Sequence, residues 1–408
     1  MKAEQRRPIW AIAGLAAVLL TTVNVSYADE IKEDLGAGPF YVWEGDVPAT
    51  AGQLLRQQPL EKELVLSEAD SGTRILYASQ GWNGQPVAVS GTVFIPKGEA
   101  PETGWPVLAW SHGTVGTADI CAPSYAGQSP RDQDYLNKWL KAGYAIVATD
   151  YEGLGTPGAH TYLHCQSQAT ANVDAVRSSQ QLGQNLSKRW LVVGQSQGGQ
   201  AALCTGGIAA THAPELDFLG VLATAPAVYF ARRFGEGDAE DPNPFIGFSL
   251  MLARGFEAFE PTFRSENAFR PEALALLPLT DTACVDGVLG AGMKAGLTTG
   301  QSLKVIPFGD IPGVAQAAEK MKVPIGSQSA PVYIGQGTSD PIVHARDVYE
   351  FSTRLCDTGV AVTLDIYDGA DHSGPMNTGF DAFVAWVTDR FAGNAVTNNC
   401  EAIETLAP

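Results

Sequence analysis

The chain has 408 residues, of which 45% are hydrophobic and 17% charged, and its formal net charge at pH 7 is −18. This composition is typical of a globular protein, and the length allows one large domain or two smaller ones. The negative charge argues against nucleic acid as a partner and against binding to anionic lipid by charge.

The first 28 residues have the organisation of an export signal. Basic residues precede an apolar run from Ile9 to Leu20, and the small residues Ser26 and Ala28 stand at the two positions that a signal peptidase recognises. We therefore expect residues 1–28 to be removed and the protein to be secreted or periplasmic. An uncleaved membrane anchor is the alternative, although the apolar run is short for a span of about 20 residues.

Beyond the signal, an acidic lead-in (residues 29–70) is expected to pack on the surface of the core, and two β-rich segments, 73–80 and 87–96, could pair. From there, apolar strands alternate with helical segments. The strands are predicted at 105–113, 145–149, 189–194, 218–226, 330–337 and 361–369, and the helices around 135–140 and at 168–184, 198–210, 344–356 and 380–391. Such alternation indicates an α/β fold, with a mostly parallel sheet and helices on both of its faces.

The alternation stops between residues 227 and 327. This stretch contains apolar, aromatic segments of helical character, and a connection of that length and hydropathy predicts a structured, mainly helical cap. The cap would be inserted before the strand at 330–337. We therefore expect a core made of residues 29–226 and 328–408, with an independent second domain as the alternative.

The stretch "WLVVGQSQGGQAAL" contains a serine between two glycines, Gly194-Gln195-Ser196-Gln197-Gly198. By itself this G-x-S-x-G match is weak, because the chain contains 44 glycines. Here the serine follows an apolar strand and precedes a helix of small residues, the context in which a tight turn raises a nucleophilic serine above a sheet. We therefore predict that Ser196 is a nucleophile; an ordinary glycine-rich turn is the alternative.

A serine hydroxyl needs a general base, and His372 is the best candidate for that role. It lies in "YDGADHSGP", after the last predicted strand, and Asp340 is the only carboxylate of "YIGQGTSDPIV", after the preceding strand. The order serine, acid, histidine is that of α/β-hydrolases, in which the acid holds the imidazole tautomer and stabilises the imidazolium. The pattern predicts a triad of Ser196, Asp340 and His372.

Each partner of the serine also has a plainer interpretation. Asp340 could cap the helix that follows it, and His372 could form hydrogen bonds within its loop. Asp368 and Asp371 are the alternatives for the acid and His344 for the base, in loop positions that fit less well.

Two backbone N–H groups are expected to stabilise the oxyanion that forms on the substrate. The first is that of Gln197, directly after the serine. The second should come from the loop after the strand at 105–113, where we favour Thr114 and then Gly113. His112 is expected to order this loop rather than to perform chemistry.

Six cysteines, at positions 121, 165, 204, 284, 356 and 400, suggest up to three disulfides in an exported chain. Six cysteines allow 15 pairings, and their spacing does not choose among them. We predict no metal and no cofactor, because no C-x-x-C or H-E-x-x-H occurs. His160, His164 and Cys165 could suggest metal ligands, but the cysteine is expected to be oxidised.

From about Gly72 to Cys400, the chain resembles a known family, the secretory lipases of the fungal lipase A type. The similar segments are "DICAPSY" (119–125), "ATDYEGLG" (148–155), "VVGQSQGGQAA" (192–202), "PFIGFSLMLARG" (244–255), "SDPIV" (339–343) and "DGADHSG" (368–374). The resemblance implies an α/β-hydrolase with a large cap, in which Ser196, Asp340 and His372 match the family triad. The fungal proteins carry an acidic residue in the oxyanion loop, whereas residues 110–118 of this chain contain none.

The resemblance also implies a disulfide pattern. Cys121 would pair with Cys284, tying the core to the cap, and Cys356 with Cys400, tying down the C-terminus. Cys165 and Cys204 are then left as a third pair.

The expected function is that of an exported serine carboxylic-ester hydrolase, a lipase or esterase that acts through an acyl-enzyme on a small-molecule or lipid ester. Transient contact with a lipid surface is expected, and no obligate protein partner is evident. Apolar cap residues could form an acyl pocket or simply pack in a helix: Phe245, Phe248, Leu250, Met251 and Leu252. The rival functions are a serine peptidase or amidase of the same fold and a non-catalytic binding protein that kept the fold.

Overall fold

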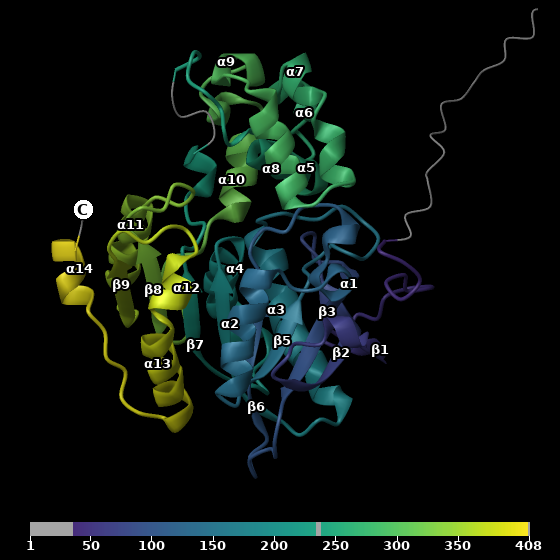
Figure 1. Ribbon diagram of the computed structural model, residues 1–408, viewed down its shortest axis with the longest axis vertical. Helices are drawn as coiled ribbons and strands as arrows, with labels where there is room; N and C mark the ends of the chain where they lie inside the picture. Colours follow the sequence, from purple (N-terminus) through teal and green to yellow (C-terminus); the bar gives the residue numbers. More distant parts are fainter. Residues whose placement is uncertain (1–35, 234–237, 407–408) are drawn as a thin grey trace, which may run out of the picture. The chain divides into compact units, whose positions relative to one another are not determined.

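The computed structural model describes residues 36–233 and 238–406 (Figure 1). The predicted signal at residues 1–28 lies outside the described residues. The described residues belong to one compact unit. In the described part of the chain, no helix has both the length and the hydropathy needed to cross a membrane.

A nine-stranded sheet forms the centre of this unit, with the strand order β1-β2-β3-β5-β4-β6-β7-β8-β9. The strands are β1 (Leu54–Pro59), β2 (Ala69–Gln80), β3 (Pro86–Pro96), β4 (Trp105–Ser111), β5 (Ala145–Thr149), β6 (Leu186–Gln195), β7 (Asp217–Thr224), β8 (Val332–Gly337) and β9 (Val362–Tyr367). The pairs β1–β2, β2–β3 and β3–β5 are antiparallel, and all pairs from β5 to β9 are parallel. The predicted mostly parallel sheet is confirmed.

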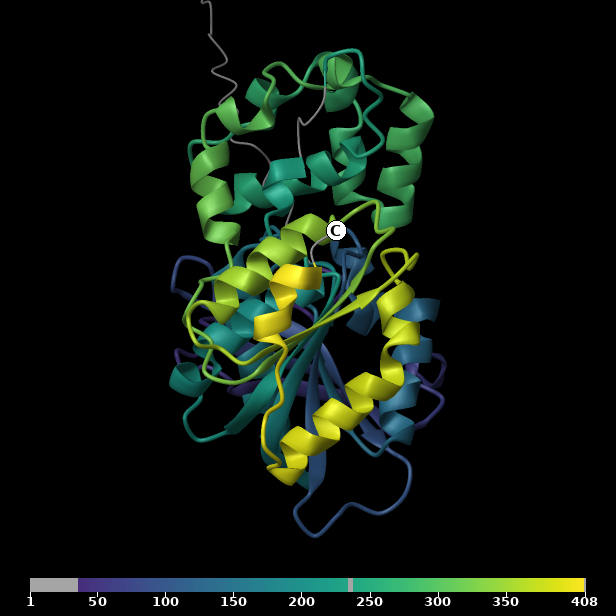
Figure 2. The ribbon, with the colours of Figure 1, turned by 90° about the vertical axis from the view of Figure 1, so that its left-hand side faces the viewer.

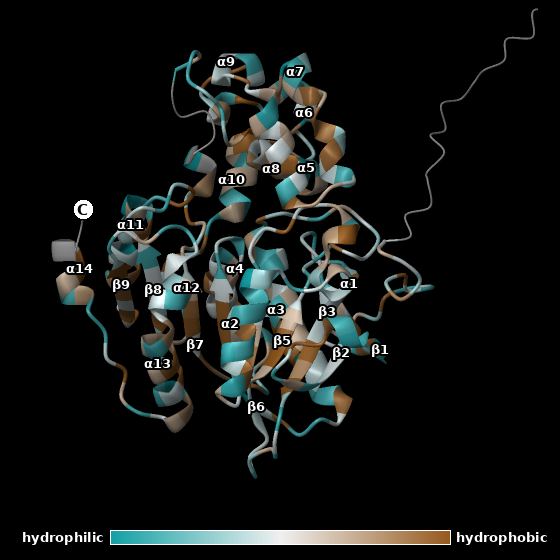
Figure 3. Ribbon diagram, viewed as in Figure 1, coloured by the Kyte–Doolittle hydropathy of each residue, from teal (hydrophilic) through white to brown (hydrophobic). Residues whose placement is uncertain are grey.

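Successive residues of each strand face opposite sides of the sheet, so both faces need cover. On one side, Val107 and Ala109 of β4 pack in a cluster with residues of α3 and α4. On the other side, Leu108 and Trp110 pack with residues of α2 and α13. Figure 3 shows the resulting hydrophobic colouring of the inner strands, and Figure 2 shows the layers from a second direction. The helices outside the cap are α1 (Pro123–Ala126), α2 (Pro130–Lys141), α3 (Cys165–Ser179), α4 (Gln197–His212), α11 (Ala345–Cys356), α12 (Gly374–Thr378), α13 (Phe380–Ala392) and α14 (Cys400–Leu406).

Between β7 and β8 the chain is helical, as the interruption of the alternation predicts. This segment is called the cap. Its limits at residues 227 and 327 are those predicted from the sequence. Its helices are α5 (Ile246–Phe259), α6 (Ser265–Ala268), α7 (Pro271–Leu274), α8 (Val285–Ala295), α9 (Thr299–Ser302) and α10 (Val314–Met321). Figures 1 and 2 show them gathered beyond one end of the sheet. The N–H of Val285 donates to the carbonyl of Val115 at 2.8 Å, so the start of α8 contacts the loop that follows β4.

Three disulfides connect separate elements. Cys121–Cys284 joins the loop after β4 to the start of α8, Cys165–Cys204 joins α3 to α4, and Cys356–Cys400 joins α11 to α14. These are the pairs that the family resemblance implies. One of them ties the cap to the core.

We expected the lead-in to pack on the surface of the core, but part of it joins the sheet. Within it, residues 54–59 form β1, which pairs with β2 at the edge of the sheet. The sequence of β1, "LLRQQP", lacks an apolar alternation, because an edge strand pairs on one side only and tolerates polar residues and a terminal proline. The short helix α14 at the C-terminus was likewise not predicted.

Candidate active site

Ser196 has an unusual backbone conformation, with φ 60° and ψ −120°. A non-glycine residue rarely adopts this region, and it persists only where surrounding contacts enforce it. Here the Ser196 N–H donates to the carbonyl of Thr224 at 2.9 Å, and the Ser196 carbonyl accepts from the N–H of Ala227 at 3.1 Å. The strained residue lies between the end of β6 and the start of α4, the position of a nucleophile elbow.

The two glycines around Ser196 are sterically required. A Cβ at Gly194 would lie 2.0 Å from the carbonyl oxygen of Gly198, and a Cβ at Gly198 would lie 1.8 Å from that of Ser111. Both distances are far below van der Waals contact, so any side chain would force the strand and the helix apart. The tight turn that the sequence predicts is therefore present.

Asp340 and His372 meet at the carboxyl ends of β8 and β9. His372 Nδ1 lies 2.7 Å from Asp340 Oδ2, and the other carboxylate oxygen accepts the N–H groups of Ile342 and Val343 at 2.8 and 2.9 Å. Burial alone would raise the pKa of Asp340, but the hydrogen bond from His372 and these N–H groups outweigh it, and the pKa lies below its usual value. An ionised carboxylate can only accept a hydrogen bond, so Nδ1 of His372 is the donor in this contact.

The alternative acids and base have other partners. Asp368 accepts from the hydroxyl of Thr338, and Asp371 accepts from the N–H groups of Ser373 and Gly374. His344 stands at the N-terminal end of α11. Within the described chain the imidazole of His372 has one carboxylate partner, which is that of Asp340.

A side chain that the sequence analysis did not single out connects the elbow to the loop of His372. Gln195 is fully buried, and its Nε2 donates to the carbonyl of His372 at 3.1 Å. Its Oε1 lies close to Gly113, where an added Cβ would approach it to 2.8 Å. The sequence feature that could have identified Gln195 is its position, as a polar residue at the buried end of an apolar strand and next to the serine.

The loop after β4 is held by hydrogen bonds that orient its peptide groups. The buried His112 ring contacts the carbonyl of Gly113 through Nδ1 at 2.7 Å, and the Tyr151 hydroxyl donates to the carbonyl of His112 at 3.0 Å. Burial lowers the pKa of His112, so the ring is neutral and Nδ1 donates. In a trans peptide the N–H points away from the carbonyl, so these contacts also orient the N–H groups of Gly113 and Thr114. His112 thus orders the loop, as predicted.

Two further predictions concern residues near the site. Cys165 is oxidised, so it offers no thiolate, and Nδ1 of His164 accepts the N–H of Ser167 at 3.2 Å. Across residues 36–233 and 238–406, no group of three or more His, Cys, Asp or Glu side chains is arranged to hold a metal. Leu250, Met251 and Leu252 are fully buried in the hydrophobic core, which is the packing alternative to an acyl pocket.

The strand order and the strained serine between β6 and α4 define the class of protein, which is that of the α/β-hydrolases. Within this class, the model of the secretory lipase family matches residues 129–399. The chain belongs to this family; it is a carboxylic-ester hydrolase and an exported protein.

Individual relatives are distant but cover most of the chain. A probable inactive lipase of Mycobacterium tuberculosis (strain CDC 1551 / Oshkosh) is 23% identical, over 88% of this chain and 83% of the relative. Lipase 5 of Candida albicans is 25% identical, over 90% of this chain and 83% of its own length. The closed state of Candida antarctica lipase A has a TM-score of 0.73 and 20% identity, and the match covers 88% of this chain and 86% of that one. At this identity the structural likeness establishes the fold.

Proposed function

We propose that the protein hydrolyses acyl esters through an acyl-enzyme, with Ser196 as nucleophile, His372 as general base and Asp340 as the residue that orients His372. The observation that carries this proposal is the 2.7 Å contact between His372 Nδ1 and Asp340 Oδ2, in a loop that Gln195 joins to the elbow of Ser196. The two contacts support this assignment, because they join His372 to Asp340 and join the loop of His372 to the residue before Ser196.

In the proposed reaction, Ser196 Oγ attacks the ester carbonyl carbon while His372 Nε2 takes its proton. The tetrahedral intermediate collapses as the imidazolium returns that proton to the departing alcohol, which leaves the acyl group on the serine. Water, deprotonated by the same imidazole, then attacks the acyl-enzyme and releases the acid. Asp340 remains ionised throughout and stabilises the imidazolium.

The proposed oxyanion donors are the N–H of Gln197 and one from the loop after β4. Gln197 is the first residue of α4, and the N–H groups of a first helical turn have no acceptor inside the helix. The contacts of His112 and Tyr151 favour Thr114 or Gly113 as the second donor, because they orient both peptide groups without using either N–H. Both donors would be fixed before the substrate arrives, which makes them effective.

An apolar ester fits the surroundings of the serine. A cavity of about 170 Å³ is lined by Ala227, Tyr229, Phe230, Arg232, Ala318, Met321 and Lys322. One of these residues, Ala227, contacts the elbow, because its N–H donates to the carbonyl of Ser196, whereas Ser196, Asp340 and His372 do not line the cavity. The mainly apolar lining supports an acyl chain, and with it a lipid ester as substrate and transient contact with a lipid surface.

The rival functions need a direct test, because one relative is named a probable inactive lipase. The experiment is a rate series on p-nitrophenyl esters from acetate to palmitate, with an anilide as the amidase control. Ser196→Ala should lower kcat by at least about 10⁴-fold, and the exposed Ser67→Ala should leave it unchanged. Full ester hydrolysis by Ser196→Ala, or faster cleavage of the anilide than of any ester, would contradict the proposal.

A further inference from the structure

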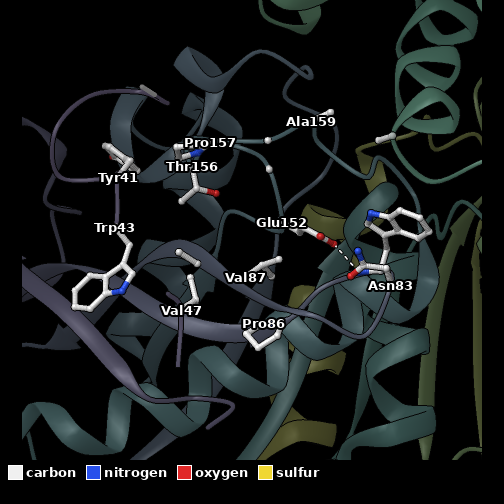
Figure 4. Close-up of a pocket in the computed structure, with 15 residues that line it drawn as sticks. Tyr41, Trp43, Val47, Asn83, Pro86, Val87, Glu152, Thr156, Pro157 and Ala159 are labelled. Atoms are coloured by element: carbon white, nitrogen blue, oxygen red, sulfur yellow. Dashed lines mark hydrogen bonds between the residues drawn. The ribbon is translucent and has the colours of Figure 1, made fainter. Parts of the chain in front are cut away.

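A second pocket, of about 410 Å³, lies among four segments of the chain (Figure 4). The lead-in, the β2–β3 turn and the loop after β5 form its walls, and Ala258 of α5 adds a contact from the cap. In Figure 4, Trp43 stands at one end and Asn83 at the other, with Thr156, Glu152 and Val87 between them. The volume is within the range of small-molecule sites, about 300–1,000 Å³.

Two polar groups of this pocket have an oxygen without a partner in the described chain, and one of these oxygens, Thr156 Oγ1, is buried. Glu152 is 8% exposed, and its Oε2 accepts from the N–H of Trp82 and from the hydroxyls of Thr161 and Ser167. Its Oε1 accepts no hydrogen bond from any residue of the described chain. Thr156 is 1% exposed, and its Oγ1 has no partner within the same residues. Buried polar atoms are nearly always paired in folded proteins, so the unpaired Thr156 hydroxyl, in the same pocket as the open Oε1 of Glu152, favours a hydrogen-bonding ligand here.

Charges around the pocket select for a neutral ligand. Lys320 Nζ lies 5.6 Å from the ring centroid of Trp82, and the guanidinium carbon of Arg56 lies 5.9 Å from that of Trp43. Each tryptophan of the pocket therefore already faces a cation of the protein, which disfavours a cationic ligand. The Glu152 carboxyl disfavours an anion. Burial raises the pKa of Glu152, which also favours hydrogen bonding to a neutral hydroxyl over ion pairing.

We propose that this pocket binds a neutral sugar ring, either free or as the terminal residue of a larger molecule. A pyranose has hydroxyls at its edge and an apolar face. The hydroxyls would satisfy Glu152 Oε1, Thr156 Oγ1 and the side-chain amide of Asn83. The apolar face would lie on Trp82, Val87 and Pro86.

The test is direct binding, measured by calorimetry and ligand-observed NMR on the full chain carrying Ser196→Ala, with a panel of methyl pyranosides. Choline and acetate serve as the cationic and anionic comparisons. Saturable binding of at least one pyranoside, with neither comparison ligand bound, is the expected result. Oligosaccharides of the bound sugar distinguish a site for the free sugar from a site for the terminal residue of a larger molecule. A site for a terminal residue should bind them at least as tightly as the monosaccharide.

Two variants locate the binding. Thr156→Val removes the hydroxyl at constant size and should weaken binding about 10-fold, and Val87→Trp should abolish it by filling the pocket. The exposed Thr211→Val is the matched control for the first, and unchanged melting temperatures would exclude misfolding. No binding of any sugar, binding of choline alone, or sugar binding that survives Val87→Trp would overturn the proposal. None of these outcomes depends on ester hydrolysis, so the proposed function stands or fails separately.

Discussion

The side-chain amide of Gln195 donates to the main-chain carbonyl of His372 at 3.1 Å. The same buried side chain packs against Gly113, so one residue contacts both the loop of the proposed base and the loop of the proposed oxyanion donors. Gln195 precedes Ser196 directly in the chain. Its side chain therefore sets the spacing between the serine segment and the two loops that must act with it.

Gln195→Met should lower kcat by roughly 10–100-fold with little change in KM, because it keeps the size of the side chain and loses the hydrogen bond to the His372 loop. Steady-state kinetics on a p-nitrophenyl ester measure both constants. The exposed Gln133→Met is the matched control. A variant with a raised KM and an unchanged kcat would assign Gln195 to substrate binding instead.

Asp340→Asn should lower kcat by about 10⁴-fold, because the amide no longer fixes the imidazole tautomer. The fold should persist, since the amide oxygen can still accept the N–H groups of Ile342 and Val343. Circular dichroism and ester kinetics check the two expectations. Asp368→Asn is the control among the alternative acids; a larger loss in that variant would reassign the acid.

The elements that the sequence predicted well are those with strong local signals. The strands from 105 onward are short and apolar, and the glycines at 194 and 198 are required by a turn whose sterics can be stated in advance. The proximity of Asp340 and His372 could be predicted because the carboxyl ends of parallel strands lie at the same edge of a sheet. The polar edge strand β1 gives no periodic signal, and the contact between Gln195 and His372 joins residues far apart in the sequence. No local pattern encodes such a contact.

Glu152→Gln should change how stability depends on pH. Because burial raises the pKa of Glu152 in the fold, the folded chain holds its proton after the unfolded chain has lost it. The contribution of Glu152 to stability therefore falls as pH rises from the ordinary glutamate pKa of 4.5 through the raised value in the fold. The amide keeps an acceptor for the same donors and has no charge, so Glu152→Gln should lose less stability over that range.

Chemical denaturation at several pH values from acid to neutral measures this difference. The exposed Glu99→Gln serves as control and should track the native protein. If Glu152→Gln also follows the native curve, the carboxyl has no raised pKa in solution.

Replacing Cys121 and Cys284 together by serine should lower the free energy of unfolding by about 2–5 kcal/mol, because the bridge closes a long stretch of chain. It should also lower kcat/KM, since Cys284 forms a β-bridge with Gly116 in the oxyanion loop. The Cys356 and Cys400 double variant is the comparison, because that bridge joins α11 to α14. Its stability should fall while its kcat/KM stays unchanged, and equal kinetic losses in both variants would contradict the link.

The attachment of α8 to the core also limits how the cap can move. The Cα atoms of Cys121 and Cys284 are held 5.5 Å apart by a covalent bridge, and the hydrogen bond from the N–H of Val285 to the carbonyl of Val115 reinforces it. If the cap opens, this point must stay in place. The gap between cap and core would then be widest on the side of the cap opposite the bridge. A bulky ester would enter from that side, and reduction of the disulfide would remove this covalent restraint on the cap.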